Sequence, residues 1–323
     1  MKTIILISLM FILSNCKGKD KTKSEIKVEN YIQSKTENYK KFELKKISEF
    51  NRGRGYEDED KFCIKIADSF GIDKSFYEVD FDNNGLLDYL VIGDNHNCSG
   101  DNNTSCDFSS MVLMKFPKDS VKSFHLIKSH SGCIVPKIVR NGSTNLLEIY
   151  NQKRGVWSEK GNNIEKNTLI YKFDEFIDFN KNPIKQNIEK IEYSTAGCYG
   201  TCPVFELTIN KNKSSVFIAK QYNFGTVEER RKQISNNKDE GIFKTEIKEQ
   251  NFNEIINLLE YMNFEALENK YSVNWTDDQR SFLKITYNNG KVKIIEDYGL
   301  IGTYSLKKLY QLLFNLRKNQ NWK

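Results

Sequence analysis

Short apolar runs separated by polar turns dominate the chain from Tyr77 to about residue 150. The runs alternate with segments rich in Asn and Gly, and they lie at 89–92, 111–114, 124–127, 134–139 and 146–150. Runs of this length between turn signals are typical of β-strands. Residues 25–50 carry a looser apolar pattern that favours a helix. The pattern therefore predicts a mainly β first domain over residues 25–180.

Beyond Pro183 the pattern alternates between strands and amphipathic helices. Strands are predicted at 188–193, 204–209, 216–219, 282–287 and 292–296, with Asn288-Asn289-Gly290 as the hairpin turn of the last two. A helix is predicted to start at an Asn251–Glu254 capping box, and another near Ser305. Strands with two one-sided helices predict a two-layer α+β second domain over residues 184–323. The fold class is α+β, with the boundary near 180–183.

The N-terminus reads as an export signal. Lys2 precedes an apolar stretch over residues 4–13, which is too short to span a bilayer as a helix. Leu13-Ser14-Asn15-Cys16 then resembles the lipobox of bacterial lipoproteins. That resemblance implies a signal peptide over 1–15, acylation of Cys16 and a tether over 16–24. The partner would be membrane lipid, in the outer membrane because Lys17 gives no reason for inner-membrane retention. The alternative is an ordinary signal peptide with a chance cysteine.

Composition narrows the function classes. The 323 residues are 38% hydrophobic and 28% charged, which is a globular composition. A mean hydropathy of −0.61, with no long apolar run after residue 15, excludes a polytopic membrane protein. The net charge of +6 is spread along the chain without a basic stripe. Together with export, this argues against a nucleic-acid partner.

The cysteine count fits an oxidising compartment. The seven cysteines are Cys16, Cys63, Cys98, Cys106, Cys133, Cys198 and Cys202. Lipidation of Cys16 leaves an even number, which permits three disulfides. Proximity favours Cys98–Cys106 and Cys198–Cys202, and Cys63–Cys133 follows by elimination. Six cysteines allow fifteen pairings, so the two local pairs are the better supported.

An acidic loop is the clearest candidate metal site. The candidate ligands are Asp80, Asp82, Asn84, the backbone carbonyl of Leu86, and Asp88. Alternate oxygen-bearing residues in a tight loop can converge on Ca²⁺, and Gly85 permits the turn. The loop is similar to the Asp-x-Asp-x-Asn-Gly-x-x-Asp loop of FG-GAP and VCBS-type β repeats, which implies a structural calcium between two strands. The alternative is an Asx-rich hairpin that binds no ion.

A second motif is Cys198-Tyr199-Gly200-Thr201-Cys202-Pro203. It resembles a family of unknown function in bacterial envelope proteins. Tyr271, Thr276-Asp277 and the Asn289-Gly290 hairpin sit where that family's pattern places them, so the resemblance spans about 185–320. The family implies no activity. A structural disulfide is the favoured interpretation, and redox exchange or Cu(I) binding by the two thiolates are the alternatives.

No catalytic constellation emerges from the sequence. His96, His125 and His130 are interpreted as surface or hydrogen-bonded residues, because no nucleophile elbow accompanies them. The Asp277-Asp278 pair is explained as a loop cap before a strand. We therefore expect a lipid-anchored envelope protein of unassigned activity, a non-catalytic binding or scaffolding module. One alternative is a thiol–disulfide or copper-handling protein that uses Cys198 and Cys202. Another is calcium-dependent binding of a ligand or glycan through the first domain, and the sequence does not identify the protein or glycan partner.

Overall fold

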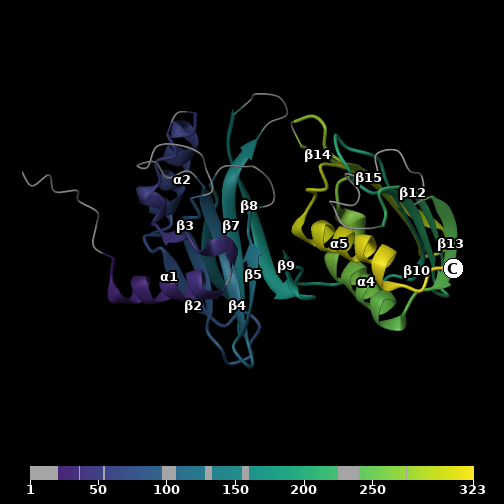
Figure 1. The fold of residues 1–323 in the computed structure, drawn as a ribbon, viewed down its shortest axis with the longest axis horizontal. Helices are drawn as coiled ribbons and strands as arrows, with labels where there is room; N and C mark the ends of the chain where they lie inside the picture. The colour runs from purple at the N-terminus through teal and green to yellow at the C-terminus, as the bar shows by residue number, and fades with distance from the viewer. Residues whose placement is uncertain are drawn as a thin grey trace, which may run out of the picture.

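The fold consists mainly of β-sheets, in agreement with the predicted α+β class. The computed structural model describes residues 21–35, 37–53, 55–96, 107–127, 133–154, 160–224, 240–273 and 275–323. Within these ranges the strands form three sheets, accompanied by four α-helices. Figure 1 shows the first two sheets with α1 and α2 at one end of the molecule, and the third sheet with α4 and α5 at the other.

The elements have the following bounds. The helices are α1 (Lys23–Lys35), α2 (Glu57–Ser69), α4 (Glu249–Met262) and α5 (Tyr304–Asn319). The first sheet contains β1 (Glu43–Leu44), β2 (Phe76–Val79), β3 (Asp88–Asp94), β4 (Phe108–Phe116) and β5 (Ser120–His125). The second sheet has the order β6 (Val135–Asn141), β7 (Thr144–Arg154), β8 (Lys160–Lys172) and β9 (Glu175–Asp178). The third sheet has the order β13 (Gly241–Glu246), β12 (Ser214–Gln221), β11 (Val204–Asn210), β10 (Ile188–Thr195), β15 (Arg280–Tyr287), β16 (Lys291–Tyr298) and β14 (Lys270–Ser272).

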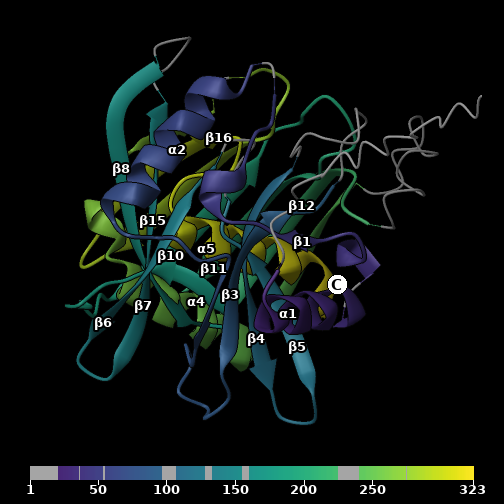
Figure 2. The ribbon, with the colours of Figure 1, turned by 90° about the vertical axis from the view of Figure 1, so that its left-hand side faces the viewer.

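The central strands of the first sheet, β3 and β4, are buried on both faces. On β3, Leu90 and Ile92 belong to the core shared with the second sheet, whereas Tyr89 and Val91 pack with Ile32 of α1. Successive side chains of a strand point to opposite faces, so burying both faces requires an unbroken apolar run. This is why 89–92 reads as continuous hydrophobic sequence. Figure 2 shows α1 in front of β4 and β5.

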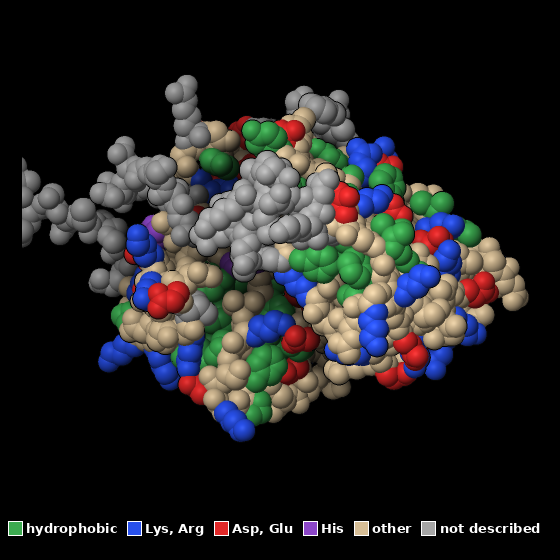
Figure 3. Space-filling model, turned by 45° about the vertical axis from the view of Figure 1, so that its right-hand side comes forward, with side chains coloured by type: hydrophobic (Ala, Val, Ile, Leu, Met, Phe, Trp, Pro, Cys, Tyr) green, Lys and Arg blue, Asp and Glu red, His purple; other side chains and the backbone are tan. Residues whose placement is uncertain are grey.

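Among the described residues, the third sheet is covered on one face, by α4 and α5. Burial alternates along β10, where Ile191 and Tyr193 point into a core shared with α4 and α5. On the other face Glu192 forms ion pairs with Lys190, at 2.8 Å, and Lys284, at 2.9 Å. Figure 3 shows acidic and basic side chains interspersed over the visible face of the molecule.

The second-half helices form as predicted, but one predicted cap is wrong. α5 begins at Tyr304, and the Thr303 side chain caps it by accepting a hydrogen bond from the Leu306 backbone N–H. α4 begins at Glu249, before the predicted Asn251–Glu254 box. The Asn251 side chain instead accepts a hydrogen bond of 2.8 Å from Gln320, just beyond the end of α5. Tertiary contact has taken the place of local capping.

The first half departs further from the sequence pattern. α1 ends at Lys35, so only the first part of the segment 25–50, predicted as a helix, belongs to α1. α1 also starts at Lys23, inside the expected tether. α2 was not predicted, because its buried positions, Cys63, Ile66 and Ala67, follow a run of acidic residues. None of the described helices is long and apolar enough to cross a membrane.

The start of α5 is inserted between the two ends of the molecule. Tyr304 lies in the core of the first two sheets, and its hydroxyl donates to the Leu126 carbonyl at 2.7 Å. The Ser305 backbone N–H donates to Asp178 on β9 at 2.8 Å, and the Asp178 backbone N–H donates back to the Ser305 hydroxyl at 3.1 Å. The third sheet and its helices are therefore joined to the first half by specific contacts.

Candidate metal centre and disulfide loops

The acidic loop joins two strands, as its sequence predicts. It connects β2 to β3, which pair antiparallel, and Gly85 adopts a φ of 84° in the turn. Asp80, Asp82 and Asp88 each offer a carboxylate oxygen, and these oxygens lie within 4.8 Å of one another. The structure thus brings together the three acidic members of the predicted ligand set.

Asp88 is the buried member of this cluster. Its side chain is fully buried, and its two oxygens accept the backbone N–H groups of Lys115, at 2.8 Å, and Phe81, at 2.9 Å. Burial raises the Asp88 pKa to about 6, the two hydrogen bonds oppose this, and the Asp82 and Asp80 charges add to it. The loop therefore concentrates negative charge around a carboxylate with no solvent contact.

Asn84 is a hydrogen-bond donor within this loop. Its backbone N–H donates to Asp80 Oδ1 at 3.1 Å and to Asp82 Oδ1 at 3.2 Å, and its side-chain amide donates to Asp82 Oδ2 at 3.0 Å. Its own Oδ1 accepts the Leu86 N–H at 2.7 Å. Such bonds belong to an Asx-rich turn. Ligation by Asn84 and by the Leu86 carbonyl stays a prediction.

Two of the three expected disulfides lie within the described residues. Cys63 on α2 is joined to Cys133 just before β6, with a Cα–Cα distance of 6.3 Å. Cys198 is joined to Cys202 with a Cα–Cα distance of 5.7 Å. Both distances suit a disulfide. Cys16, Cys98 and Cys106 lie outside the described residues, as does His130.

The Cys198–Cys202 loop is held at one end of the third sheet by a segment distant in sequence. The Tyr199 backbone N–H donates to the Asp277 carbonyl at 3.0 Å. The Gln279 side chain donates to the carbonyls of Ala196, at 3.0 Å, and Pro203, at 2.7 Å. The Tyr199 side chain is 88% exposed. The Cys198–Cys202 loop and residues 277–279 therefore form one structural unit, and the Tyr199 side chain of this unit is exposed to solvent.

Asp277 and Asp278 do not act as a facing pair. The Asp278 side chain accepts hydrogen bonds from Trp275 Nε1 at 3.0 Å and from the Gln279 backbone N–H at 2.7 Å. Asp277 has a φ of 70° and uses its carbonyl to hold Tyr199. These contacts fit the expected role of a loop cap before β15.

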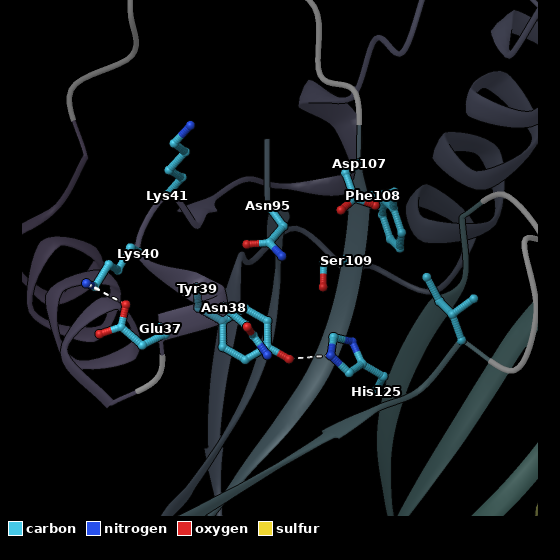
Figure 4. Close-up of a pocket in the computed structure, with 11 residues that line it drawn as sticks. Glu37, Asn38, Tyr39, Lys40, Lys41, Asn95, Asp107, Phe108, Ser109 and His125 are labelled. Carbon is cyan, nitrogen blue, oxygen red and sulfur yellow. Dashed lines mark hydrogen bonds and ion pairs between the residues drawn. The ribbon is translucent and has the colours of Figure 1, made fainter. Parts of the chain in front are cut away.

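A pocket beside Asn95 escaped the sequence reasoning. It is about 620 Å³ in volume and lies between residues 37–41 and the ends of β3, β4 and β5 (Figure 4). His125, expected to be a surface or hydrogen-bonded residue, lines it and forms a hydrogen bond with the Tyr39 hydroxyl. The lining residues come from several separated segments, so no spacing in the sequence announces them.

Comparison with known proteins identifies a domain in the second part of the chain. No curated protein and no solved structure matches it. Residues 189–317 match DUF6438, a domain of unknown function. This range includes the Cys198–Cys202 loop, the Asn288-Asn289-Gly290 hairpin and most of α5. The resemblance inferred from the motif is thereby confirmed at the level of a domain of unknown function: the chain carries a DUF6438 domain in its second part.

Proposed function

We propose that this chain is a lipid-anchored envelope protein, held in the outer membrane by acylated Cys16, that serves as a non-catalytic binding or scaffolding module. The observation that carries this proposal is the pair of disulfides, Cys63–Cys133 and Cys198–Cys202. Disulfides persist in oxidising compartments and are rare in the cytosol. The lipobox-like sequence before Cys16 supplies a route to such a compartment.

The proposal includes two domains, over residues 25–180 and 184–323. The distribution of strands supports this division, because each of the three sheets takes its strands from one side of Pro183 only. The β-rich first domain would carry the acidic loop, and the α+β second domain would carry the Cys198–Cys202 loop.

Mass spectrometry of the native protein tests the anchor and the compartment together. The expected N-terminal peptide begins at Cys16 and carries acyl groups, and the other six cysteines resist alkylation until a reductant is added. A Cys16→Ser variant is expected to lose the acyl mass and the membrane association while keeping its disulfides. An intact leader, or thiols that react without reduction, would overturn the proposal.

The acidic loop is proposed to hold one structural Ca²⁺. Three carboxylates whose oxygens lie within 4.8 Å of one another support this, because a bound cation would offset their mutual repulsion. Calorimetric titration with Ca²⁺ should show one site in the wild type and none in Asp82→Ala. Asp68→Ala, an exposed aspartate on α2, is the matched control and should bind normally. Equal calcium uptake by the Asp82 variant would refute the site.

The alternative function is thiol–disulfide exchange or copper handling by Cys198 and Cys202. Both cysteines are partly exposed, and accessibility is one requirement of a redox pair. Titration of the folded protein with a graded dithiol buffer separates the two functions. A structural pair stays oxidised until strongly reducing conditions, whereas an exchange pair is reduced near the glutathione potential. Cu(I) binding by the reduced protein would favour the copper alternative.

A further inference from the structure

The pocket beside Asn95, here called the Asn95 pocket, has the size of a ligand site. Its volume of about 620 Å³ falls within the range of roughly 300–1,000 Å³ typical of small-molecule sites. Figure 4 shows Asn95, Ser109 and His125 arranged around an open space, with the Tyr39 hydroxyl joined to the His125 ring. The pocket shares no residue with the acidic loop or with the disulfides.

Asn95 carries the strongest sign of a missing partner. Its side chain lines the pocket and is only 7% exposed, and its Oδ1 has no hydrogen-bond partner in the described part of the chain. Buried polar atoms are nearly always paired, because leaving one unpaired costs free energy. A ligand N–H or O–H could donate a hydrogen bond to this amide oxygen. The pocket therefore favours a ligand that carries a hydrogen-bond donor.

Tyr39 and His125 form an uncharged polar pair in the lining of the Asn95 pocket. The Tyr39 hydroxyl is hydrogen-bonded to His125 Nε2. Desolvation raises the pKa of Tyr39 and lowers the pKa of His125, so both groups are neutral at neutral pH. The pair therefore offers a dipolar surface to a ligand and no formal charge.

The charges around the pocket cancel. Glu37 forms an ion pair with Lys40 at 2.6 Å, and the remaining charged lining residues, Lys41 and Asp107, have opposite signs. Phe108 and Ile127 contribute apolar surface to the same wall. A lining without net charge, with an apolar side and an unpaired acceptor, suits a neutral ligand with both polar and apolar groups.

We infer that the Asn95 pocket binds a neutral sugar carrying an acetamido group. The acetamido N–H would donate to the Asn95 side chain, and its methyl group would rest on the apolar wall of Phe108 and Ile127. The ring hydroxyls would exchange hydrogen bonds with Ser109 and His125. This assignment deepens the proposed binding role of the module and is independent of lipid anchoring and of calcium.

The test is a titration of the full chain with N-acetylglucosamine, followed by NMR chemical-shift changes. Binding is expected to saturate, and glucose, which lacks the acetamido group, should bind about tenfold more weakly. Asn95→Leu should weaken N-acetylglucosamine binding by about tenfold or more while raising the thermal midpoint of the ligand-free protein, because the unpaired acceptor is removed. A merely structural role for Asn95 would not give these two opposite effects.

Two further variants keep the outcome decisive. Asn257→Leu, the same change at an exposed site on α4, should bind like the wild type. Ser109→Ala removes a hydroxyl from the pocket and should weaken binding even if the Asn95 variant does not fold. Absence of saturable binding by the wild type, equal binding of glucose, or undiminished binding by a folded Asn95 or Ser109 variant would overturn the inference.

Discussion

At the scale of single residues, Asp88 shows how a position in a motif can acquire a different environment from its neighbours. The spacing of Asp80, Asp82 and Asp88 was visible in the sequence, and so was the turn at Gly85. Burial was not, because it depends on strand β4, whose Lys115 backbone N–H contacts Asp88. The same packing that hides the carboxylate raises its pKa.

Asp88 gives the first prediction, on the pH dependence of stability. Its pKa is about 6 in the folded protein against an ordinary value of 3.8. Between these values the unfolded chain has released the proton while the folded chain still holds it, so stability falls as pH rises. In chelator, this group should lower the free energy of unfolding by roughly 2–3 kcal/mol between pH 4 and pH 6.

Urea denaturation at a series of pH values, with chelator present, measures this fall. Asp82→Asn removes a neighbouring negative charge and should make the fall shallower than in the wild type. Saturating Ca²⁺ is expected to restore stability above pH 6, where the cluster is ionised. Identical pH profiles for the wild type and the Asp82 variant would contradict the role assigned to the neighbouring charges.

At the scale of elements, local periodicity succeeded for the strands and helices of the second half that bury one face. The alternation along β10, and the apolar faces of α4 and α5, were read correctly from the sequence. It failed for α2, whose contacts with the second sheet outweigh its weak pattern. It also misplaced the start of α4, because the predicted cap residue Asn251 is engaged by Gln320 instead.

The two disulfides give the second prediction. Cys63–Cys133 spans 70 residues and Cys198–Cys202 spans four. In the loop-entropy description, the longer loop should contribute about 4 kcal/mol to stability and the shorter about 2 kcal/mol. Replacing both cysteines of a pair by alanine should therefore cost about twice as much at Cys63–Cys133.

Urea denaturation of the two double variants, each compared with the wild type under oxidising conditions, measures the difference. The Cys198–Cys202 variant is also the control for cysteine removal as such. A larger loss for the short loop would mean that its main role is to hold the folded corner at Asp277 and Gln279, and that the entropic ranking is wrong.

At the scale of the whole molecule, Tyr304 links the DUF6438 domain to the first half. Its ring lies in the core of the first two sheets, and it is the first residue of α5. Tyr304→Ala should cost about 3–5 kcal/mol, as expected for removing a buried aromatic side chain. Tyr304→Phe keeps the ring and loses only the hydrogen bond to Leu126, so it should cost about 1 kcal/mol.

Differential scanning calorimetry and limited proteolysis test this coupling. The wild type should unfold in a single transition and resist cleavage near residues 180–184. The alanine variant should show two separated transitions and faster cleavage there, because the start of α5 is no longer anchored in the core of the first two sheets. A single unshifted transition in the alanine variant would show that the contact does not couple the two halves.

The sequence by itself determined the strand and helix faces of the second half, the turn chemistry of the acidic loop and the hairpin, and the Cys198–Cys202 pairing. All of these follow from interactions between residues close in the chain, where period, turn residues and spacing decide the outcome. Only the tertiary structure decided the burial of Asp88, the insertion of Tyr304 between the two halves and the Asn95 pocket. Each of these depends on packing between segments far apart in sequence, for which no local pattern carries a signal.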